Sequence, residues 1–293
     1  MQSINRLNVK VIIPTYNAGA RFKKTLDMLK VQNGLTQKDI LIVDSSSTDG
    51  TQELVKKYGY ELIIISKEEF GHGKTRKMAA EKAGNAEIVI FMTQDALPYD
   101  ENTISNICAY FDIDEKVSAV YGRQVPYPDS DVFGTHARLF NYPEKSYIRE
   151  FEDRKKYGIK TAFFSDTFGA YKKDILDIMG GFPDVNFGED TVMAGKMLIA
   201  GYRIGYCAEA KVYHSHSFTI REEYQRSKEI GRFHKAQPWL IRTFGKAEGE
   251  GLRFVNSEFL FLKRINKLYM IPYMLLRIFI KYFGFLTARL WRN

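Results

Sequence analysis

Short apolar runs alternate with segments of helical apolar spacing through the first part of the chain. The runs that predict strands are residues 9–13, 39–43, 61–65 and 87–92, and the first of them reads as a buried strand. The segments that predict amphipathic helices are residues 20–31, 49–58 and 73–83. Because each connection is short, we expect these strands to lie parallel and to be joined by right-handed crossovers. The pattern therefore predicts an α/β fold.

The same reading extends to about residue 220, where the pattern changes. Further strands are expected at 117–121, 168–171 and 210–213, and a further helix at 191–200. Residues 122–166 are polar and aromatic without a regular period, and so long a segment inside a compact domain is usually functional. Beyond residue 220 the strand patterns stop. We therefore expect a main domain over residues 1–220 and a helical region over residues 221–293.

Composition supports a large buried core and a reducing compartment. The 293 residues are 45% hydrophobic, which is ample for a globular core. The two cysteines, Cys108 and Cys207, are far apart and indicate no disulfide framework. Residues 1–10 lack the apolar stretch of a secretory signal, so none is expected.

The formal net charge is +8, and the excess of cations is greatest at the carboxyl-terminal end. Residues 259–293 contain no acidic residue. This imbalance favours an anionic surface as a partner. We expect no nucleic-acid partner, and the sequence leaves a homo-oligomer open.

The apolar end of the chain predicts an amphipathic helix lying in a membrane surface. Pro272, Arg277, Lys281 and Arg289 interrupt the apolar run, so a clean membrane span is not expected. On a helical wheel the cations of one face are Lys263, Lys267, Arg277, Lys281, Arg289 and Arg292. The opposite face carries Leu275, Ile278, Phe279, Phe283, Leu286 and Leu290. The alternative is a helix over 260–293 that packs on the main domain or on a partner subunit.

Polar residues follow the first two predicted strands, where a parallel sheet presents its carboxyl edge. Thr15 and Asn17 lie just past the first strand, and Asp44 ends the second. Open α/β sheets bind ligands at this edge. Asp44 is placed to accept the imide N–H of uracil or thymine, whereas the Ser/Thr/Asp cluster after it also suits a turn and a helix cap.

Residues 71–76 (GHGKTR) form a glycine- and cation-rich turn at a predicted helix start. Free backbone N–H groups and the helix dipole favour a diphosphate there, with Lys74 and Arg76 as cations. The GxxxxGK[ST] spacing of a nucleoside triphosphatase loop is absent. A solvated basic turn is the alternative.

Carboxylates and histidines follow the later strands. Asp95, after Gln94, could hold Mg²⁺ or Mn²⁺ across two phosphates, because hard cations prefer oxygen ligands. Glu189 and Asp190 open a predicted helix, where acids are also favoured by the helix dipole alone. His214 and His216 fall on one face of a strand, and His214 is mildly preferred over His216 as a metal ligand, with a structural histidine as the alternative.

Taken in order, these motifs resemble those of family-two inverting glycosyltransferases. The matching segments are residues 13–17 (IPTYN), 43–51 (VDSSSTDGT), 93–95 (TQD) and 189–190 (ED). Three segments are similar in sequence to bacterial rhamnosyltransferases of that family, namely residues 71–76 (GHGKTR), 93–96 (TQDA) and 187–190 (FGED). The resemblance covers residues 9–220 and implies a GT-A fold, with a nucleotide-sugar half at 1–121 and an acceptor half at 122–220.

The resemblance also implies roles for individual residues. Thr15, Asn17 and Asp44 would hold the nucleoside, with Arg76 near the base or diphosphate. Asp95 would bind the metal, and Asp190 would be the catalytic base with Glu189 as the alternative. Three positions depart from the family pattern, namely Thr93 for the first metal acid, Ser45 for a second acid after Asp44, and Lys77 for an asparagine.

The sequence thus predicts a rhamnosyltransferase that uses dTDP-β-L-rhamnose and extends a lipid-linked surface or cell-wall polysaccharide. We expect it at the cytoplasmic face of the cell membrane, as a peripheral protein that needs a divalent cation. One alternative is the same fold with another donor, such as a UDP-hexose. Another is a catalytically weak scaffold within a polysaccharide-assembly complex, which Thr93 keeps open. An enzyme that makes nucleotide sugars is disfavoured, because no glycine-rich triphosphate loop follows the first strand.

Overall fold

The computed structural model describes residues 8–290, and its contacts divide the chain into two compact units. The first unit contains the chain up to residue 125 together with Pro143–Phe151 and Ala162–His214. The second contains Pro126–Tyr142, Glu152–Thr161 and the chain from Ser215 onward. The boundary expected at residue 220 differs from this division, because two segments of the irregular region 122–166 belong with the carboxyl-terminal helices.

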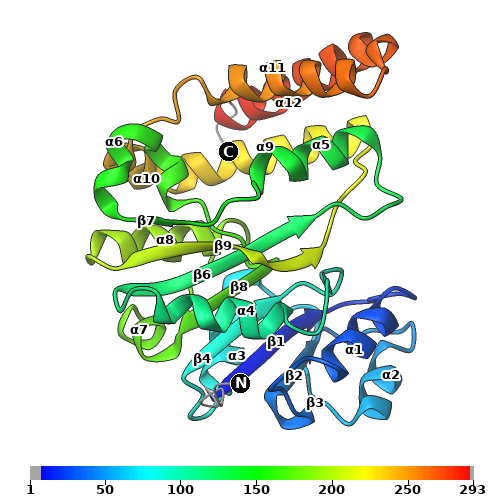
Figure 1. Ribbon diagram of the computed structural model, residues 1–293, viewed down its shortest axis with the longest axis vertical. Helices are drawn as coiled ribbons and strands as arrows, with labels where there is room; N and C mark the ends of the chain where they lie inside the picture. The colour runs from blue at the N-terminus through cyan, green and yellow to red at the C-terminus, as the bar shows by residue number, and fades with distance from the viewer. Residues whose placement is uncertain (1–7, 291–293) are drawn as a thin grey trace. The chain divides into compact units, whose positions relative to one another are not determined.

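The first unit is built on a nine-stranded sheet (Figure 1). Its strands are β1 (Val9–Thr15), β2 (Ile40–Asp44), β3 (Glu61–Ile64), β4 (Ile88–Met92), β5 (Leu97–Pro98), β6 (Val117–Val125), β7 (Tyr147–Arg149), β8 (Phe168–Lys172) and β9 (Arg203–Tyr213). The order is β3-β2-β1-β4-β8-β6-β9-β5, with β7 paired to β9. The strands β3, β2, β1 and β4 are parallel, as the sequence predicts. β8 runs antiparallel to β4 and β6, so the sheet is mixed.

Helices flank this sheet and bury its parallel part on both faces. They are α1 (Phe22–Lys30), α2 (Thr51–Tyr58), α3 (His72–Glu81), α4 (Thr103–Ala109), α7 (Lys173–Ile178) and α8 (Glu189–Ile199). Short 3-10 turns lie at Gln37–Asp39, Tyr110–Asp112, Phe151–Asp153 and Gly158–Ala162. Every residue of β2 and β4 is buried, as expected for central parallel strands covered by helices. The helices expected at 20–31, 49–58, 73–83 and 191–200 are all present.

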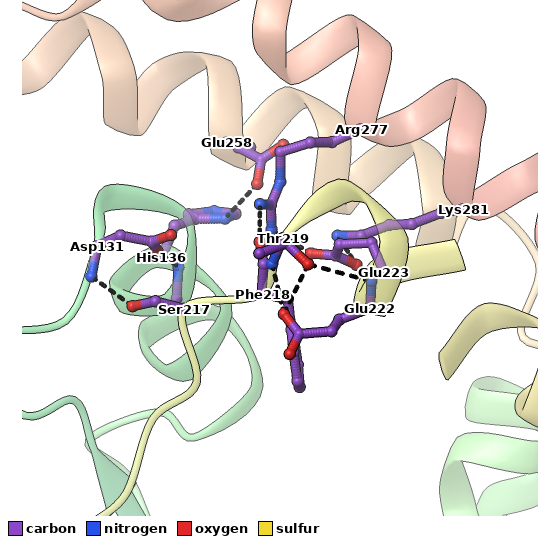
Figure 2. Close-up of polar contacts among 11 residues, drawn as sticks. Asp131, His136, Ser217, Phe218, Thr219, Glu222, Glu223, Glu258, Arg277 and Lys281 are labelled. Atoms are coloured by element: carbon purple, nitrogen blue, oxygen red, sulfur yellow. Dashed lines mark hydrogen bonds and ion pairs between the residues drawn. The ribbon is translucent and has the colours of Figure 1, made fainter. Parts of the chain in front are cut away.

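The second unit is helical. It contains α5 (Val132–Asn141), α6 (Arg154–Tyr157), α9 (Ile220–Ala236), α10 (Pro238–Phe244), α11 (Glu250–Arg264) and α12 (Ile271–Leu290). Phe133, Leu262 and Met274 form a small core where α5, α11 and α12 meet. Beside it the imidazole of His136 lies 3.0 Å from the Ser257 hydroxyl and 3.5 Å from the Glu258 carboxylate (Figure 2).

The prediction of one amphipathic helix over 260–293 is wrong. α11 ends at Arg264, Asn266 adopts a left-handed conformation with φ of 56°, and a 3-10 turn at Leu268–Met270 precedes α12. Asparagine tolerates this conformation, so it can end a helix and redirect the chain. Lys263 and Lys267 therefore do not share a helix with Arg277. The side chains of Arg289 and Leu290, and Arg292 as a whole, lie outside the described residues.

The segment Leu268–Ala288 is long and apolar enough to cross a membrane by length and composition, with a mean hydropathy of 1.3. Only 17% of its most apolar window is buried, so it is not the core helix of a soluble domain. Its exposed residues are considered below.

Candidate active site

The carboxyl ends of β1 and β2 are tied together by the Asp44 carboxylate. Asp44 is fully buried, and its two oxygens accept hydrogen bonds from the Thr15 and Ser47 hydroxyls, the Ser47 N–H and the Gln52 amide. Such a carboxylate has no lone pair to spare for a ligand. Both side chains are buried and bonded to each other, and their contact with the nucleoside stays a prediction. They organise the loop that follows β2.

Tyr16 and Asn17, which follow β1 at the same edge, are exposed. Hydrogen bonds to neighbouring loops fix their position. The Gln94 amide accepts from the Tyr16 N–H at 2.8 Å and donates to the Tyr16 carbonyl at 3.2 Å, which joins the tips of β1 and β4. Asn17 is left-handed, with φ of 44°, and its side-chain oxygen accepts from the Thr48 N–H. The exposed ring of Tyr16 lies 4.8 Å from the Lys67 ammonium. Tyr16, which sequence reasoning did not single out, is the aromatic surface of this edge.

The turn at residues 71–76 does not form an open anion cradle. The Gly73 N–H donates to the Val185 carbonyl, and the Gly71 N–H donates to the Thr75 hydroxyl. A Cβ at Gly73 would lie 1.8 Å from the Pro183 carbonyl oxygen, so only glycine allows this contact. Two of the N–H groups expected to be free for a diphosphate are therefore occupied, and the diphosphate site stays a prediction. The turn supports the loop that leads to Glu189 and Asp190, and within it the side chains of His72 and Lys74 are exposed.

Arg76 points into the first unit rather than toward the open edge. Its guanidinium is buried and pairs with Glu189 at 2.7 Å and with Asp166 at 3.1 Å. These two carboxylates raise the pKa of Arg76 against the opposing effect of burial, so it is a fixed positive charge. The Nε and Nη1 atoms of the guanidinium are engaged with these carboxylates, and the implied role beside the base or diphosphate stays a prediction. Arg76 positions the acidic residues of the site.

Asp166 is the functional residue that sequence reasoning missed. It is buried, accepts a hydrogen bond from the Tyr171 hydroxyl at 2.6 Å, and donates its backbone N–H to Asp190 at 3.2 Å. Burial raises its pKa well above the ordinary value, although Arg76 opposes the shift. The available signal was its position at the end of the polar segment 122–166, directly before a strand. That signal does not reveal its partners, which come from α3 and α8.

Among the carboxylates of Asp166, Glu189 and Asp190, that of Asp190 is the one suited to accept a proton. It lies in the first turn of α8, and its oxygens accept hydrogen bonds from the backbone of Thr191 and of Asp166. Burial and the neighbouring charge of Glu189 raise the pKa of Asp190 to about 6. A carboxylate poised near neutral pH is both ionised and basic enough to accept a proton. Glu189, the alternative base, is buried and held by Arg76.

A second cluster joins Asp95, after β4, to His214, after β9. The Asp95 Oδ2 and His214 Nε2 atoms are 3.4 Å apart. His214 Nδ1 lies 2.8 Å from the Gln124 side-chain oxygen, which can only accept, so Nδ1 carries a proton. In the neutral imidazole, Nε2 then presents a lone pair toward a carboxylate oxygen. Two acceptors facing each other fit a shared cation, and the Nδ1–H bond is the usual support of a metal-binding histidine.

Two further observations concern the surroundings of this cluster, and the second links it to Asp190. The buried Thr93 hydroxyl, two residues before Asp95, has no hydrogen-bond partner within residues 8–290. The Gln124 amide that holds His214 also donates to the Ser165 hydroxyl at 2.9 Å. Ser165 precedes Asp166, whose N–H binds Asp190, so the two clusters belong to one region of the first unit. His216 falls in the second unit, where its ring stacks on Phe218.

Comparison with known proteins identifies the family. The model of glycosyl transferase family 2 matches residues 10–179. The chain belongs to glycosyltransferase family 2. It is 42% identical to the O-antigen chain rhamnosyltransferases WbaN of Salmonella anatum and RfbN of Salmonella typhimurium, over 97% and 98% of this chain and 90% and 91% of theirs.

Solved structures agree on the fold. The mannosyltransferase PcManGT of Pyrobaculum calidifontis, in complex with GDP-Man and Mn²⁺, superposes with a TM-score of 0.67. The superposition covers 98% of this chain and 88% of that one at 20% identity. The GT-A fold of family-two glycosyltransferases, expected from the motifs, is confirmed.

Replacing Arg76 tests whether its buried guanidinium stabilises the fold of this glycosyltransferase. Arg76→Gln leaves Glu189 and Asp166 buried without their cation, so we expect a loss of about 3–5 kcal/mol in the free energy of unfolding. Urea denaturation measures this. The control is Lys74→Gln, an exposed lysine of the same helix, which should leave stability unchanged. If Arg76→Gln is as stable as wild type and loses only donor affinity, the guanidinium faces the donor instead.

Proposed function

We propose that this protein transfers L-rhamnose from dTDP-β-L-rhamnose, with inversion, to a hydroxyl of a lipid-linked polysaccharide precursor. The observation that carries the proposal is the 42% identity, over nearly the whole chain, to two relatives named as O-antigen chain rhamnosyltransferases. The arrangement of Asp190 and of the Asp95–His214 pair supports it. The two halves inferred from the motifs, 1–121 for the nucleotide sugar and 122–220 for the acceptor, remain part of the proposal.

Asp190 is the proposed base. As the acceptor oxygen bonds to the anomeric carbon and the bond from that carbon to the diphosphate breaks, the acceptor proton passes to the Asp190 carboxylate. Arg76, Glu189 and Asp166 hold this carboxylate in place through an ion pair and a backbone hydrogen bond. Fixing the base costs no reorganisation during the reaction, which is the usual way in which an enzyme site lowers a barrier.

Asp95 and His214 are the proposed metal ligands. A divalent cation held there supplies positive charge for the departing diphosphate. A carboxylate with an imidazole suits Mn²⁺ better than the harder Mg²⁺, which prefers oxygen ligands and water. Lys74 is exposed on α3 and is proposed to add a second positive charge for the diphosphate. Asn17 and Gln94 shape the nucleoside side, where the Tyr16 ring offers a stacking surface.

The proposed place of action is the cytoplasmic face of the cell membrane, where the protein is peripheral. A lipid-linked acceptor is confined to a bilayer, so an enzyme that binds the same surface meets its substrate at a higher local concentration. The apolar segment Leu268–Ala288 supports this placement.

Turnover across a panel of dTDP- and UDP-sugars tests the proposed donor. With a soluble analogue of the acceptor, dTDP-β-L-rhamnose should give the highest kcat/KM and a product of inverted anomeric configuration. A higher kcat/KM for a UDP-hexose would identify the alternative donor. If a folded protein supplied with Mn²⁺ turns over none of the donors, the proposed transfer activity would be contradicted. The role of a scaffold in a polysaccharide-assembly complex would then be favoured.

A further inference from the structure

Helix α12 is fixed against α9 by close packing of small residues. A Cβ at Gly284 would lie 2.6 Å from the Tyr224 carbonyl oxygen, and one at Gly231 would lie 2.7 Å from the Ala288 methyl group. Glycine at both positions lets the helices approach more closely than larger residues allow. One face of α12 therefore packs against α9 of the second unit, and the opposite face points outward.

The charged side chains of α12 that the structure describes, Arg277 and Lys281, lie on the face that packs on α9. Arg277 is only 4% exposed, forms an ion pair with Glu223 of α9, and donates to the Phe218 carbonyl at 3.1 Å (Figure 2). Its guanidinium also lies over the Phe133 ring, 4.6 Å from the centroid. The Lys281 ammonium is 3.4 Å from the other Glu223 oxygen. The predicted outward basic stripe is thus wrong for both residues, because one buried carboxylate binds them.

This arrangement leaves the outward face of α12 apolar. Arg277 and Lys281 are the only charged residues between Leu268 and Ala288. The side chains exposed on the helix are Tyr273, Leu275, Leu276, Phe279, Tyr282 and Phe283, at 39–62% of their full area. A run of large apolar side chains on one surface helix normally marks an interaction site.

We propose that this face of α12 docks on a lipid bilayer, with the helix lying in the membrane plane and its apolar side chains entering the acyl boundary. Glu223 makes this possible by keeping both cations on the inner side. The inference deepens the proposed peripheral localisation, and it differs from the sequence-based view in one respect. Affinity comes mainly from inserted apolar area rather than from contacts between α12 cations and lipid phosphates.

Charge favours a bilayer over a second copy of the chain. Lys263 and Arg264 are exposed at the end of α11, shortly before α12, and residues 259–293 contain no acid. A symmetric dimer through α12 would bring two such cationic segments together without compensating carboxylates from the same segment. An anionic lipid surface instead accepts them at the edge of the inserted face, adding about 1 kcal/mol per cation near the surface.

The buried pair also favours an in-plane helix over a membrane span. To cross a bilayer, α12 would have to leave α9, place Arg277 and Lys281 in lipid, and leave Glu223 without its partners. Insertion scales give about 2.5–3.5 kcal/mol for each such cation at the centre of a span. Breaking a buried pair by removing one partner costs about 3–5 kcal/mol more.

Flotation of the full-length chain with vesicles tests the proposal. Wild type should bind neutral phosphatidylcholine vesicles and bind somewhat better when phosphatidylglycerol is added. Phe279→Ser with Phe283→Ser should weaken binding to both vesicle types by at least about tenfold, because two inserted aromatic side chains are lost. The matched control is Leu252→Ser, an exposed leucine on α11, which should bind as wild type does. Point substitutions are preferred to deletion, which would strip the apolar surface of α9.

Other outcomes would overturn the proposal. Binding to anionic vesicles alone, abolished by salt and insensitive to the double substitution, would make the attraction electrostatic. A dimer in solution that the double variant converts to monomer, without vesicle binding by either protein, would make a second copy the occupant. Resistance of the bound protein to alkaline carbonate would indicate a span. Vesicle binding is read without any sugar donor, so failure of the proposed rhamnosyl transfer would not affect it.

Discussion

Asp190→Asn is expected to lower the rate of sugar transfer by at least about two orders of magnitude. The substitution keeps the size of the side chain and one of the two oxygens that accept from the Thr191 and Asp166 N–H groups, but removes the ability to accept a proton. Positioned general bases contribute about 10²–10⁴ in rate. Donor affinity should be nearly unchanged, because Asp190 acts on the acceptor. Single-turnover transfer and donor titration measure the two quantities separately.

The same variant provides its own control for folding. Because burial and Glu189 raise the pKa of Asp190 above its unfolded value, the folded protein binds the extra proton between about pH 4 and 6 and the charged form disfavours folding above that range. Asp190→Asn removes this buried charge but also one of the two backbone hydrogen bonds, so it should unfold near the wild-type temperature at pH 7. Wild-type turnover in this variant would move the base to another residue. A large loss of stability would mean that the rate loss is structural.

Removal of the metal cluster should have the second-largest effect. Asp95→Ala and His214→Ala are each expected to abolish metal-dependent transfer, since each removes one of the facing ligand atoms. Gln124→Ala should lower affinity for Mn²⁺ by about 10–100-fold without removing a ligand, because it frees the His214 ring. The EPR signal of Mn²⁺ reports binding directly, with and without nucleotide. Binding should be weak alone and tighter with the donor.

Removing the metal ion with a chelator tests whether transfer depends on it. Full transfer in excess EDTA would show that no metal ion is needed. Lys74 would then be the group that offsets the charge of the leaving diphosphate. Unchanged Mn²⁺ affinity in His214→Ala would mean that His214 is held by Gln124 for structural reasons alone.

Local patterns were sufficient to predict much of the fold. The strands β1 to β4 are continuous apolar runs bounded by turn residues, and their helices have clear apolar spacing. The two-residue β5 and three-residue β7 have no such signal, because strands this short are defined only by pairing with β9. The reversed direction of β8 likewise depends on the path of residues 126–167, which no local pattern records.

Sequence position alone singles out candidate residues that follow a strand, but not their contacts with distant partners. The candidates Asp95, Asp190 and His214 stay predictions as site residues, and the structure connects them through Gln124, Ser165 and Asp166. The role of Arg76 could not be predicted, because its two carboxylates lie far along the chain. The burial of Asp44 is similar, since four donors from β1, the next loop and α2 enclose it.

The carboxyl-terminal helix illustrates a different limit. A helical wheel places Arg277 and Lys281 on one side of α12 correctly, but it cannot say whether that side meets water, lipid or protein. The deciding residue is Glu223 on α9, which holds Arg277 in a buried ion pair and draws the half-buried Lys281 to the same side.

The pH dependence of kcat/KM for wild type and Asp190→Asn tests the central claim that Asp190 is the base. Protonation below its pKa of about 6 removes the acceptor of the proton, so wild-type kcat/KM should fall about tenfold per pH unit below that value and level off above it. The residual activity of Asp190→Asn should show no such fall. A wild-type profile that is flat from pH 5 to 7, or a fall that persists in the variant, would contradict the account.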